Sequence, residues 1–187
     1  QIDISPEELL RDYRSLTDSD ANEATTRIQL IDKILFGLLG WSHDDVAIEK
    51  RVSEDGNTSF SDYVFNTATT SFVIEAKRVG KTFDELPNLR KARLARNIMS
   101  GTTGDSIKQA RDYARKISVG FAIATNGAQW IIFPVNRRDG VAFNDSSAII
   151  FPNIDSVLRD DFDEFYSLLS RDAIINNSLD NELLGRI

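Results

Sequence analysis

The chain has 187 residues, a single histidine and no cysteine, with 41% hydrophobic residues, 27% charged residues and a net charge of −7. These values are typical of one globular domain, and they exclude disulfides and cysteine-ligated zinc while arguing against a histidine-based triad or a histidine-rich metal site. No apolar run approaches the roughly 20 residues that cross a bilayer, so we expect no membrane contact and a cytoplasmic location.

Two helices are expected first. Ser5 and Pro6 are the N-cap and first-position pair of a helix that should end near Leu16. A stronger helix is expected from about 20 to 39, ended by Gly40. Its predicted buried stripe consists of Ile28, Ile31, Leu35 and Leu38, widened by Leu30 and Ile34.

Three strands should follow, at 46–52, 60–66 and 71–78, because these segments are rich in aromatic and β-branched residues. A turn centred on Ala68 and Thr69 would pair the last two strands as an antiparallel hairpin. Asp62 would then face Glu75 directly. Lys77 would share the face of Glu75, since side chains two apart on a strand point the same way.

The second half of the chain should alternate helices and strands. We expect helices at 86–99, 106–117 and 155–170, and strands at 121–125, 129–134 and 141–151. Residues 99–105 are predicted as a loop, the Asn126-Gly127 pair as the tight turn of a hairpin, and the last dozen residues as a linker.

This order predicts an α/β fold in which a mixed sheet is flanked by helices in the order αβββαβ, with an extra C-terminal helix. We expect a single domain over 1–187, with its core at about 20–134 and an acidic helical extension at 151–187. The first residue is Gln1, so a fragment of a larger protein is one interpretation.

The predicted hairpin brings two carboxylates and an ammonium together in an otherwise apolar stretch, where unpaired charge is costly. A divalent metal between Asp62 and Glu75 would turn their repulsion into binding, and oxygen ligands favour Mg²⁺ or Mn²⁺. The pattern indicates a metal-dependent hydrolase. The alternative is structural, with Asp62 as an edge-strand charge and Glu75 in a buried ion pair with Lys77.

Three further polar residues border the predicted buried faces. Glu23 is either a helix N-terminal charge favoured by the dipole or a third acid that points at the sheet. Gln109 and Tyr113, four apart on one helix face, either cap the sheet as half-buried polar groups or hold a phosphate or a metal-bound water.

The charge distribution permits a nucleic-acid partner despite the negative total. Residues 77–118 contain 11 Lys or Arg against 4 Asp or Glu, and this basic block begins at the proposed site. Local charge decides where a polyanion docks. The alternative interpretation is a solvated helical face.

Six segments occur in one order that resembles a known family. They are E-A-T-T-R-I-Q-L-I-D-K-I-L-F-G-L-L-G-W (23–41), D-V-A-I-E (45–49), S-D-Y-V-F (61–65), F-V-I-E-A-K-R (72–78), I-K-Q-A-R-D-Y-A (107–114) and F-A-I-A-T-N-G-A-Q-W-I-I-F (121–133). The series is similar to the N-terminal nuclease domain of type I restriction endonuclease motor subunits, in the PD-(D/E)-x-K nuclease superfamily. It covers about residues 20–134.

The resemblance implies a restriction-endonuclease-like core and a role for each matching residue. Asp62, Glu75 and Glu23 would be the metal-binding acids, and Lys77 would orient or deprotonate the attacking water. Gln109 and Tyr113 match a Gln-x-x-x-Tyr motif of some members, and Arg78 could touch phosphate. Arg27, on the helix face of Glu23, is a further candidate for binding nucleic acid or supporting the site. Ser61 stands where the signature has proline.

We therefore expect a Mg²⁺-dependent (or Mn²⁺-dependent) (endo)deoxyribonuclease with DNA as its partner; RNA as the substrate and exonucleolytic cutting are left open. The resemblance implies a restriction or defence system with a motor domain or other subunits. Two alternatives remain: a catalytically idle domain of the same fold that binds nucleic acid or protein, and a plain interaction domain with a surface ion-pair cluster.

Overall fold

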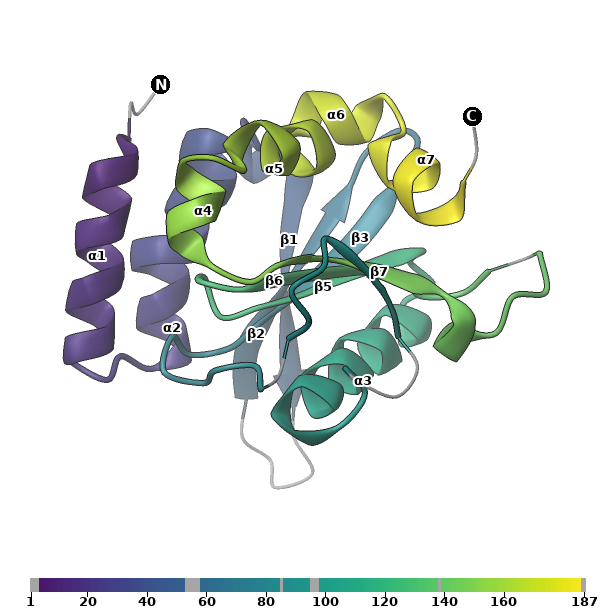
Figure 1. The fold of residues 1–187 in the computed structure, drawn as a ribbon, viewed down its shortest axis with the longest axis horizontal. Coiled ribbons are helices and arrows are strands. Elements are labelled where there is room, and N and C mark those ends of the chain that lie inside the picture. Colours follow the sequence, from purple (N-terminus) through teal and green to yellow (C-terminus); the bar gives the residue numbers. More distant parts are fainter. Residues whose placement is uncertain (1–3, 53–57, 85, 95–97, 138, 186–187) are drawn as a thin grey trace.

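The centre of the molecule is a seven-stranded mixed sheet in the order β1-β2-β3-β5-β6-β7-β4 (Figure 1). The computed structural model describes residues 4–52, 58–84, 86–94, 98–137 and 139–185, and of residues 48–52 and 58–62 it describes the backbone alone. The strands are β1 (Val46–Val52), β2 (Thr58–Asn66), β3 (Ser71–Ala76), β4 (Lys91–Arg93), β5 (Phe121–Thr125), β6 (Trp130–Pro134) and β7 (Ser147–Phe151).

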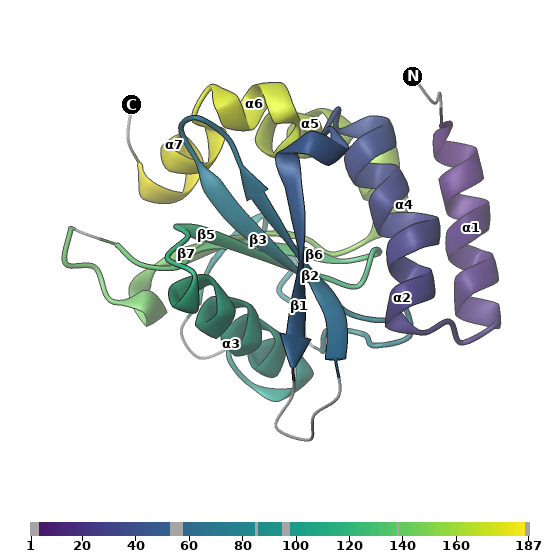
Figure 2. The same ribbon diagram turned by 180° about the vertical axis from the view of Figure 1, so that it is seen from behind.

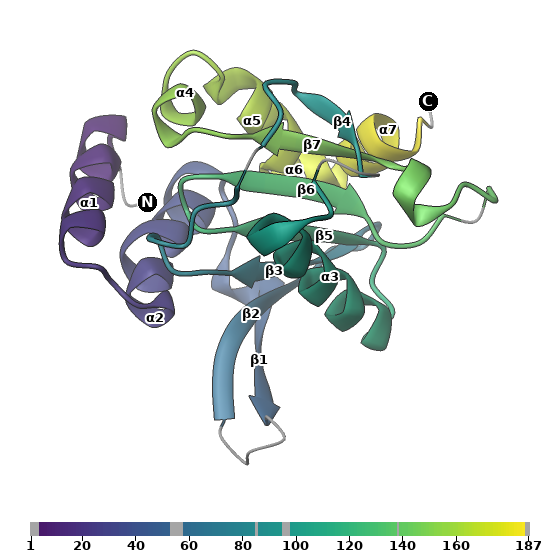
Figure 3. The same ribbon diagram turned by 60° about the horizontal axis from the view of Figure 1, so that its bottom comes forward.

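The first three strands form the expected antiparallel meander. The β2–β3 turn is closed by a bond of 2.9 Å from the Thr67 N–H to the Thr70 carbonyl oxygen, and the pairing places Asp62 opposite Glu75. The prediction of this register is confirmed. Figure 3 shows the β1–β2 hairpin extending beyond the other strands.

Helices cover both faces of the sheet (Figures 1 and 2). They are α1 (Pro6–Asp18), α2 (Glu23–Thr26), η1 (Arg27–Ile31), η2 (Lys33–Leu38), η3 (His43–Asp45), α3 (Gly101–Lys116), η4 (Phe143–Asp145), α4 (Ile154–Leu158), α5 (Phe162–Leu169), α6 (Arg171–Ile175) and α7 (Ser178–Leu184). The α3 helix lies on one face, between the parallel strands β3 and β5 in sequence. The predicted α/β class with helices on the faces of a mixed sheet is confirmed.

The two N-terminal helices are confirmed. Ser5 Oγ accepts the Glu8 N–H at 3.2 Å, with Pro6 at the first helical position. From α2 to η2 one continuous helix runs, but η1 and η2 are π-helical, as in the bond from the Leu39 N–H to the Ile34 carbonyl oxygen. The wider turn shifts the buried stripe. Ile28, expected inside, is 65% exposed, so that prediction is wrong.

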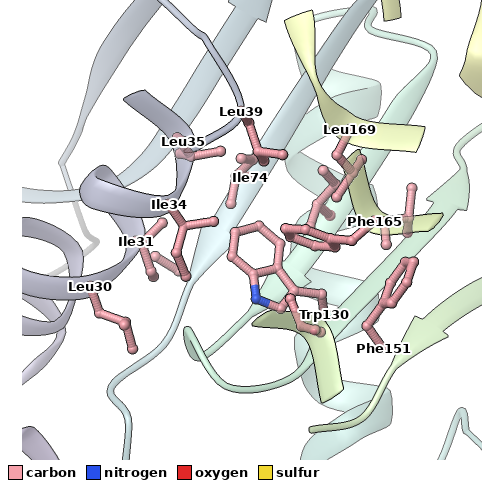
Figure 4. Close-up of a cluster of buried hydrophobic side chains, with 14 of the residues drawn as sticks. Leu30, Ile31, Ile34, Leu35, Leu39, Ile74, Trp130, Phe151, Phe165 and Leu169 are labelled. Carbon is pink, nitrogen blue, oxygen red and sulfur yellow. The ribbon is translucent and has the colours of Figure 1, made fainter. Parts of the chain in front are cut away.

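The larger core fills the face that this helix covers (Figure 4). Trp130 of β6 lies at its centre, between the π-helical turns and α5, and its ring contacts Phe165 edge-on at 5.3 Å between centroids. The other labelled members are Leu30, Ile31, Ile34, Leu35, Leu39, Ile74, Phe151 and Leu169. The C-terminal helices therefore belong to the same core as the sheet.

The smaller core lies on the opposite face, under α3. Ile107, Ala110 and Ala114 of α3 pack with Val73 and with the alanines of β5. Residues of one strand alternate between the faces, so Ile74 joins the larger core while Val73 and Glu75 face α3. This alternation decides which face carries the candidate site.

The helix predicted at 86–99 is wrong. The described part of that segment contains β4, which pairs antiparallel with the edge of β7, and the Ile150 N–H donates to the Arg90 carbonyl oxygen at 2.8 Å. Pro87 is compatible with the first turn of a helix, so the local pattern does not exclude one; the edge of β7 decides, because it offers ladder hydrogen bonds to residues 91–93. The loop predicted at 99–105 is also wrong in part, since α3 begins at Gly101 and not at 106.

The C-terminal segment differs from its prediction as well. In place of one helix at 155–170 there are two, α4 and α5, separated at Arg159, whose ψ of −97° is not helical. The last dozen residues contain α7 instead of the predicted linker, because Leu179 and Leu183 are buried against the core. Among the described residues, no helix combines the length and the apolarity that a bilayer span requires.

Candidate active site

The centre of the candidate site is the end of the β2–β3 ladder. Asp62 pairs with Glu75 across the two strands, and Lys77 follows one residue after β3 ends. The Lys77 N–H donates to the Thr125 carbonyl oxygen at 2.8 Å, which extends the parallel β3–β5 pairing to this residue. The carboxylate of Asp62 lies outside the described part of the structure. Its backbone position is the one expected for a residue that faces Glu75.

Glu75 and Lys77 form a buried charged pair. Lys77 Nζ lies 3.2 Å from Glu75 Oε1, and the two side chains are 7% and 2% exposed. A pair in such surroundings interacts strongly because little water screens it, and each partner offsets the desolvation of the other. The sequence predicted this contact from the spacing of two residues.

Gln109 joins this pair from α3. Its Oε1 accepts a hydrogen bond from Lys77 Nζ, so two acceptors fix the direction of the lysine ammonium. Tyr113, one turn further along α3, is half-buried and packs against the smaller core. The structure thus brings Gln109 to the centre of the site, and it places Tyr113 on the helix face that covers it.

The start of the second helix approaches the same end of the sheet. Asn22 Oδ1 accepts the Thr25 N–H at 2.9 Å and caps α2, and Thr26 Oγ1 accepts the Val79 N–H at 3.1 Å. Glu23, the first residue of α2, is half-buried. Its carbonyl oxygen accepts the Arg27 N–H, but its carboxylate has no hydrogen-bond or ion-pair partner among the residues that the structure describes, so it is available for a ligand.

Arg27 does not reach toward solvent. It is 9% exposed, and its guanidinium carbon lies 4.9 Å from the centroid of the Tyr63 ring. Tyr63 in turn donates its hydroxyl hydrogen to Asp32. Arg27 therefore braces β2 from the larger core, which agrees with a supporting role and not with contact to nucleic acid.

This surrounding also changes the chemistry of Tyr63. Burial and the neighbouring Asp32 carboxylate raise the pKa of the Tyr63 hydroxyl far above its ordinary value of 10.0, against a smaller opposing effect of Arg27. The residue next to Asp62 in β2 is thus a neutral, fixed tyrosine at every physiological pH.

Sequence reasoning assigned Asn126 only to a turn and missed Gln129. Asn126 Nδ2 donates to the Lys81 carbonyl oxygen at 2.8 Å, and Gln129 Oε1 accepts the Phe83 N–H at 2.9 Å. Both amides therefore hold the chain that follows Lys77. The Thr-Asn-Gly-Ala-Gln segment predicts a hairpin turn and contains no signal for a contact with residues more than 40 positions away.

The basic block divides into separate groups. Arg90 is held by Asp161 and Glu164 at 3.0 and 2.9 Å, and Arg111 lies over the Phe143 ring at 3.8 Å. The basic residues of the block that stay exposed in the described structure are Arg78, Lys91, Arg93, Lys108, Arg115 and Lys116. Only part of this basic surface is available to a polyanion, and Lys91, whose Nζ donates to the Glu182 carbonyl oxygen at 2.6 Å, lies apart from it on β4.

Among the described side chains there is no group of three or more His, Cys, Asp or Glu arranged to hold a metal ion. That set does not contain the carboxylate of Asp62. Comparison with protein-family models, with curated proteins and with solved structures gives no significant match. The geometry of the site is therefore the basis for any assignment of function.

Proposed function

We propose that the chain is a Mg²⁺-dependent or Mn²⁺-dependent nuclease that hydrolyses phosphodiester bonds of DNA on a restriction-endonuclease-like core. The observation that supports it best is the facing pair of Asp62 and Glu75 with Lys77 two residues further on. The three-strand meander, followed after the inserted edge strand β4 by α3 and the parallel strand β5, is compatible with that core.

The donor set suits a hard divalent cation. Asp62 and Glu75 supply carboxylate oxygens from facing backbone positions, and Glu23 would add a third from the start of α2. When bound, such an ion polarises the scissile phosphate and lowers the pKa of a coordinated water. Glu75 is the acid whose placement is best defined, because Lys77 and the burial of β3 restrict its side chain.

Lys77 performs the part of the chemistry that the chain itself supplies. Its ammonium would orient the attacking water and stabilise negative charge that develops on the phosphate. Gln109 holds the ammonium from the α3 side, so the lysine is directed before substrate arrives. Such preorganisation is effective because no side chain needs to reorient during the reaction.

Contacts to phosphate carry no sequence information, so we propose little sequence preference for this domain alone. A restriction or defence assembly with a motor domain would supply the choice of cleavage position. The exposed cations on α3, Lys108, Arg115 and Lys116, would contribute to backbone binding.

A second candidate function is an idle domain of the same fold that binds nucleic acid or protein. The direct contact between Lys77 and Glu75 favours it, since the pair satisfies its own charges without a metal. A metal titration separates the two: the nuclease binds Mn²⁺ at Glu75, whereas the idle domain binds nucleic acid equally well in chelator.

The nuclease is tested by incubating supercoiled DNA, linear DNA and RNA with Mg²⁺, Mn²⁺ or EDTA. We expect metal-dependent cutting of DNA that Lys77→Ala and Asp62→Ala both abolish. Lys91→Ala, on the far edge strand β4, is the control and should cut as the wild type does. A wild type that binds metal and DNA but does not cut the DNA would contradict the proposal and favour the idle domain.

A further inference from the structure

The segment directly after Lys77 is held by hydrogen bonds from α2 and from the β5–β6 turn. We propose that residues 78–83 form an arm in which Lys81 binds a phosphate next to the one at the candidate site, and that Asn126 and Gln129 hold this arm in position. The inference rests on the proposed nuclease function for its substrate, but the geometry of the arm stands independently of catalysis.

The arm has no regular secondary structure, so its position depends on individual hydrogen bonds. Three backbone groups along it, and that of Lys77 just before it, are tied to neighbouring elements. They are the Lys77 N–H to the Thr125 carbonyl oxygen, the Val79 N–H to Thr26 Oγ1, the Lys81 carbonyl oxygen to Asn126 Nδ2 and the Phe83 N–H to Gln129 Oε1, at 2.8 to 3.1 Å. Every second residue of the arm is therefore anchored, and α2 and the β5–β6 turn hold it from two sides.

Asn126 makes more contacts than its turn requires. Its Oδ1 accepts the N–H groups of Ala128 and Gln129 at 3.0 and 2.8 Å, which is the usual use of asparagine in a turn. Its Nδ2 is directed elsewhere, to the Lys81 carbonyl oxygen and to Gln129 Oε1. Since the side chain is 1% exposed, these bonds are shielded from water. The oxygen builds the turn, and the nitrogen binds the arm.

The charges of the arm differ in their availability. Arg78 is exposed but paired with Asp20 at 2.9 Å. Lys81 is half-exposed and makes no ion pair with any residue in the described ranges. Between Lys77 and Lys81 the extended chain covers at most about 14 Å. One lysine is thus committed to the candidate site, and the other is held a short distance away with its charge free.

Two cations on one short, anchored segment match a ligand that carries successive phosphates along one strand. Each phosphate neutralised by a lysine releases counterions, so its contribution is seen in the salt dependence of binding. The arm therefore predicts that Lys81 acts on affinity for polynucleotides in general and not on the choice of base.

The chain offers a matched pair of variants for the test. Asn126→Asp keeps the oxygen that accepts from the turn but loses the nitrogen that binds Lys81. Gln129→Glu adds the same negative charge three residues away, yet keeps an oxygen that accepts from Phe83 and Asn126. Lys81→Gln removes the arm's free cation, and Lys91→Gln removes a lysine from β4, four strands from β3 in the sheet order.

The experiment measures binding of a labelled DNA duplex in EDTA across a series of salt concentrations, so no cleavage is needed. The slope of log K against log salt is negative. For Lys81→Gln we expect its magnitude to decrease by about 0.9, the value for one lost phosphate contact. Lys91→Gln should leave the slope unchanged. Asn126→Asp should lower affinity, and amide hydrogen exchange over 79–83 should be faster than in Gln129→Glu, which should resemble the wild type.

Equal slopes for Lys81→Gln and the wild type would contradict the proposed role of Lys81. Equal hydrogen exchange and equal affinity in Asn126→Asp and Gln129→Glu would contradict the proposed role of Asn126. If Asn126→Asp does not fold, Thr26→Val, which removes the acceptor for Val79, replaces it with the same expectation. If Lys81→Gln weakens the salt dependence of binding but the wild type never cuts DNA, only the proposed nuclease function is contradicted. If the wild type cuts DNA but Lys81→Gln has the same salt dependence of binding, only the role of the arm is contradicted.

Discussion

Lys77 Nζ lies 3.2 Å from Glu75 Oε1 in a place where these side chains are only 7% and 2% exposed. A buried pair contributes little net stability relative to apolar residues, but removal of one partner leaves the other charge in surroundings of low dielectric. Breaking the pair therefore costs much stability, although the intact pair contributes little to it. Such a cost is typical of functional sites, where charge is retained for chemistry.

The contact between Lys77 and Glu75 predicts that substitutions can restore the stability of the fold without restoring its activity. Lys77→Met should destabilise the fold by about 3 kcal/mol, because Glu75 loses the ammonium beside it. The double variant Glu75→Gln/Lys77→Met should recover most of this loss, yet neither should cut DNA. Urea unfolding and a cleavage assay on the same samples measure both. A double variant as unstable as Lys77→Met would show that the charge pair is not the cause.

Tyr63 predicts how the protein behaves in alkali. Burial and Asp32 raise its pKa in the folded state above the ordinary 10.0. The unfolded chain therefore releases this proton first, so stability falls as the pH rises above 10. Tyr63→Phe should flatten that fall while it costs about 1–2 kcal/mol at neutral pH through the lost bond to Asp32. Urea unfolding between pH 7 and 11 tests both effects, and parallel curves for the two proteins would contradict them.

Asp45 predicts that the stability of the fold also falls in acid. Burial alone would raise its pKa, but the hydrogen bonds from Arg171 and from the Ser42 N–H, together with the Arg171 charge, hold the pKa below 3.8. The bond of 2.8 Å between Asp45 and Arg171 joins η3 to α6. Its stabilisation is present above the unfolded pKa and is lost as the pH falls through the folded one.

Asp45→Asn should therefore lower the melting temperature by about 2–4 °C at pH 7, in line with about 1 kcal/mol for a partly exposed pair. Near pH 2 the variant and the wild type should melt together. Differential scanning calorimetry at the two pH values provides the comparison. A difference that persists in acid would mean that the Arg171 contact is not its source.

Gly127 predicts a local packing failure. Its φ is +89°, and an added Cβ would lie 2.5 Å from Leu30 Cδ2. Gly127→Ala should destabilise the fold by about 2–4 kcal/mol, from backbone strain and from displacement of a core leucine. Gly120→Ala is the matched control, since nothing described lies within 4 Å of its Cβ position. Equal unfolding midpoints for the two variants would contradict the proposed clash between residue 127 and Leu30.

The register of the site was predictable because local signals agreed. Strand-forming residues flank a short Thr/Ala turn, which sets the pairing of Asp62 with Glu75. The spacing of two residues then places Lys77 beside Glu75. No long-range information was needed, and for the same reason the hairpin at Asn126-Gly127 was predicted correctly.

The failures lie where tertiary contacts override local preference. Residues 91–93 form a strand because the edge of β7 is available to pair with them, and the last helix, α7, forms because the core accepts Leu179 and Leu183. The π-helical turns rotate Ile28 outward, which a regular helical period cannot predict. The roles of Asn126 and Gln129 depend on contacts with residues 81 and 83 that no local pattern encodes.

The most direct test of the account is the single-turnover rate of DNA cleavage at increasing Mg²⁺ concentration, compared between the wild type, Glu75→Gln and Glu182→Gln. Glu75 lies at the end of β3 beside Lys77, whereas Glu182 lies on α7 and is exposed. We predict that the wild type and Glu182→Gln cut with the same saturable Mg²⁺ dependence, and that Glu75→Gln has no detectable activity at any concentration. Cleavage by Glu75→Gln at the wild-type rate, or equal cleavage in EDTA, would contradict the assignment of this site.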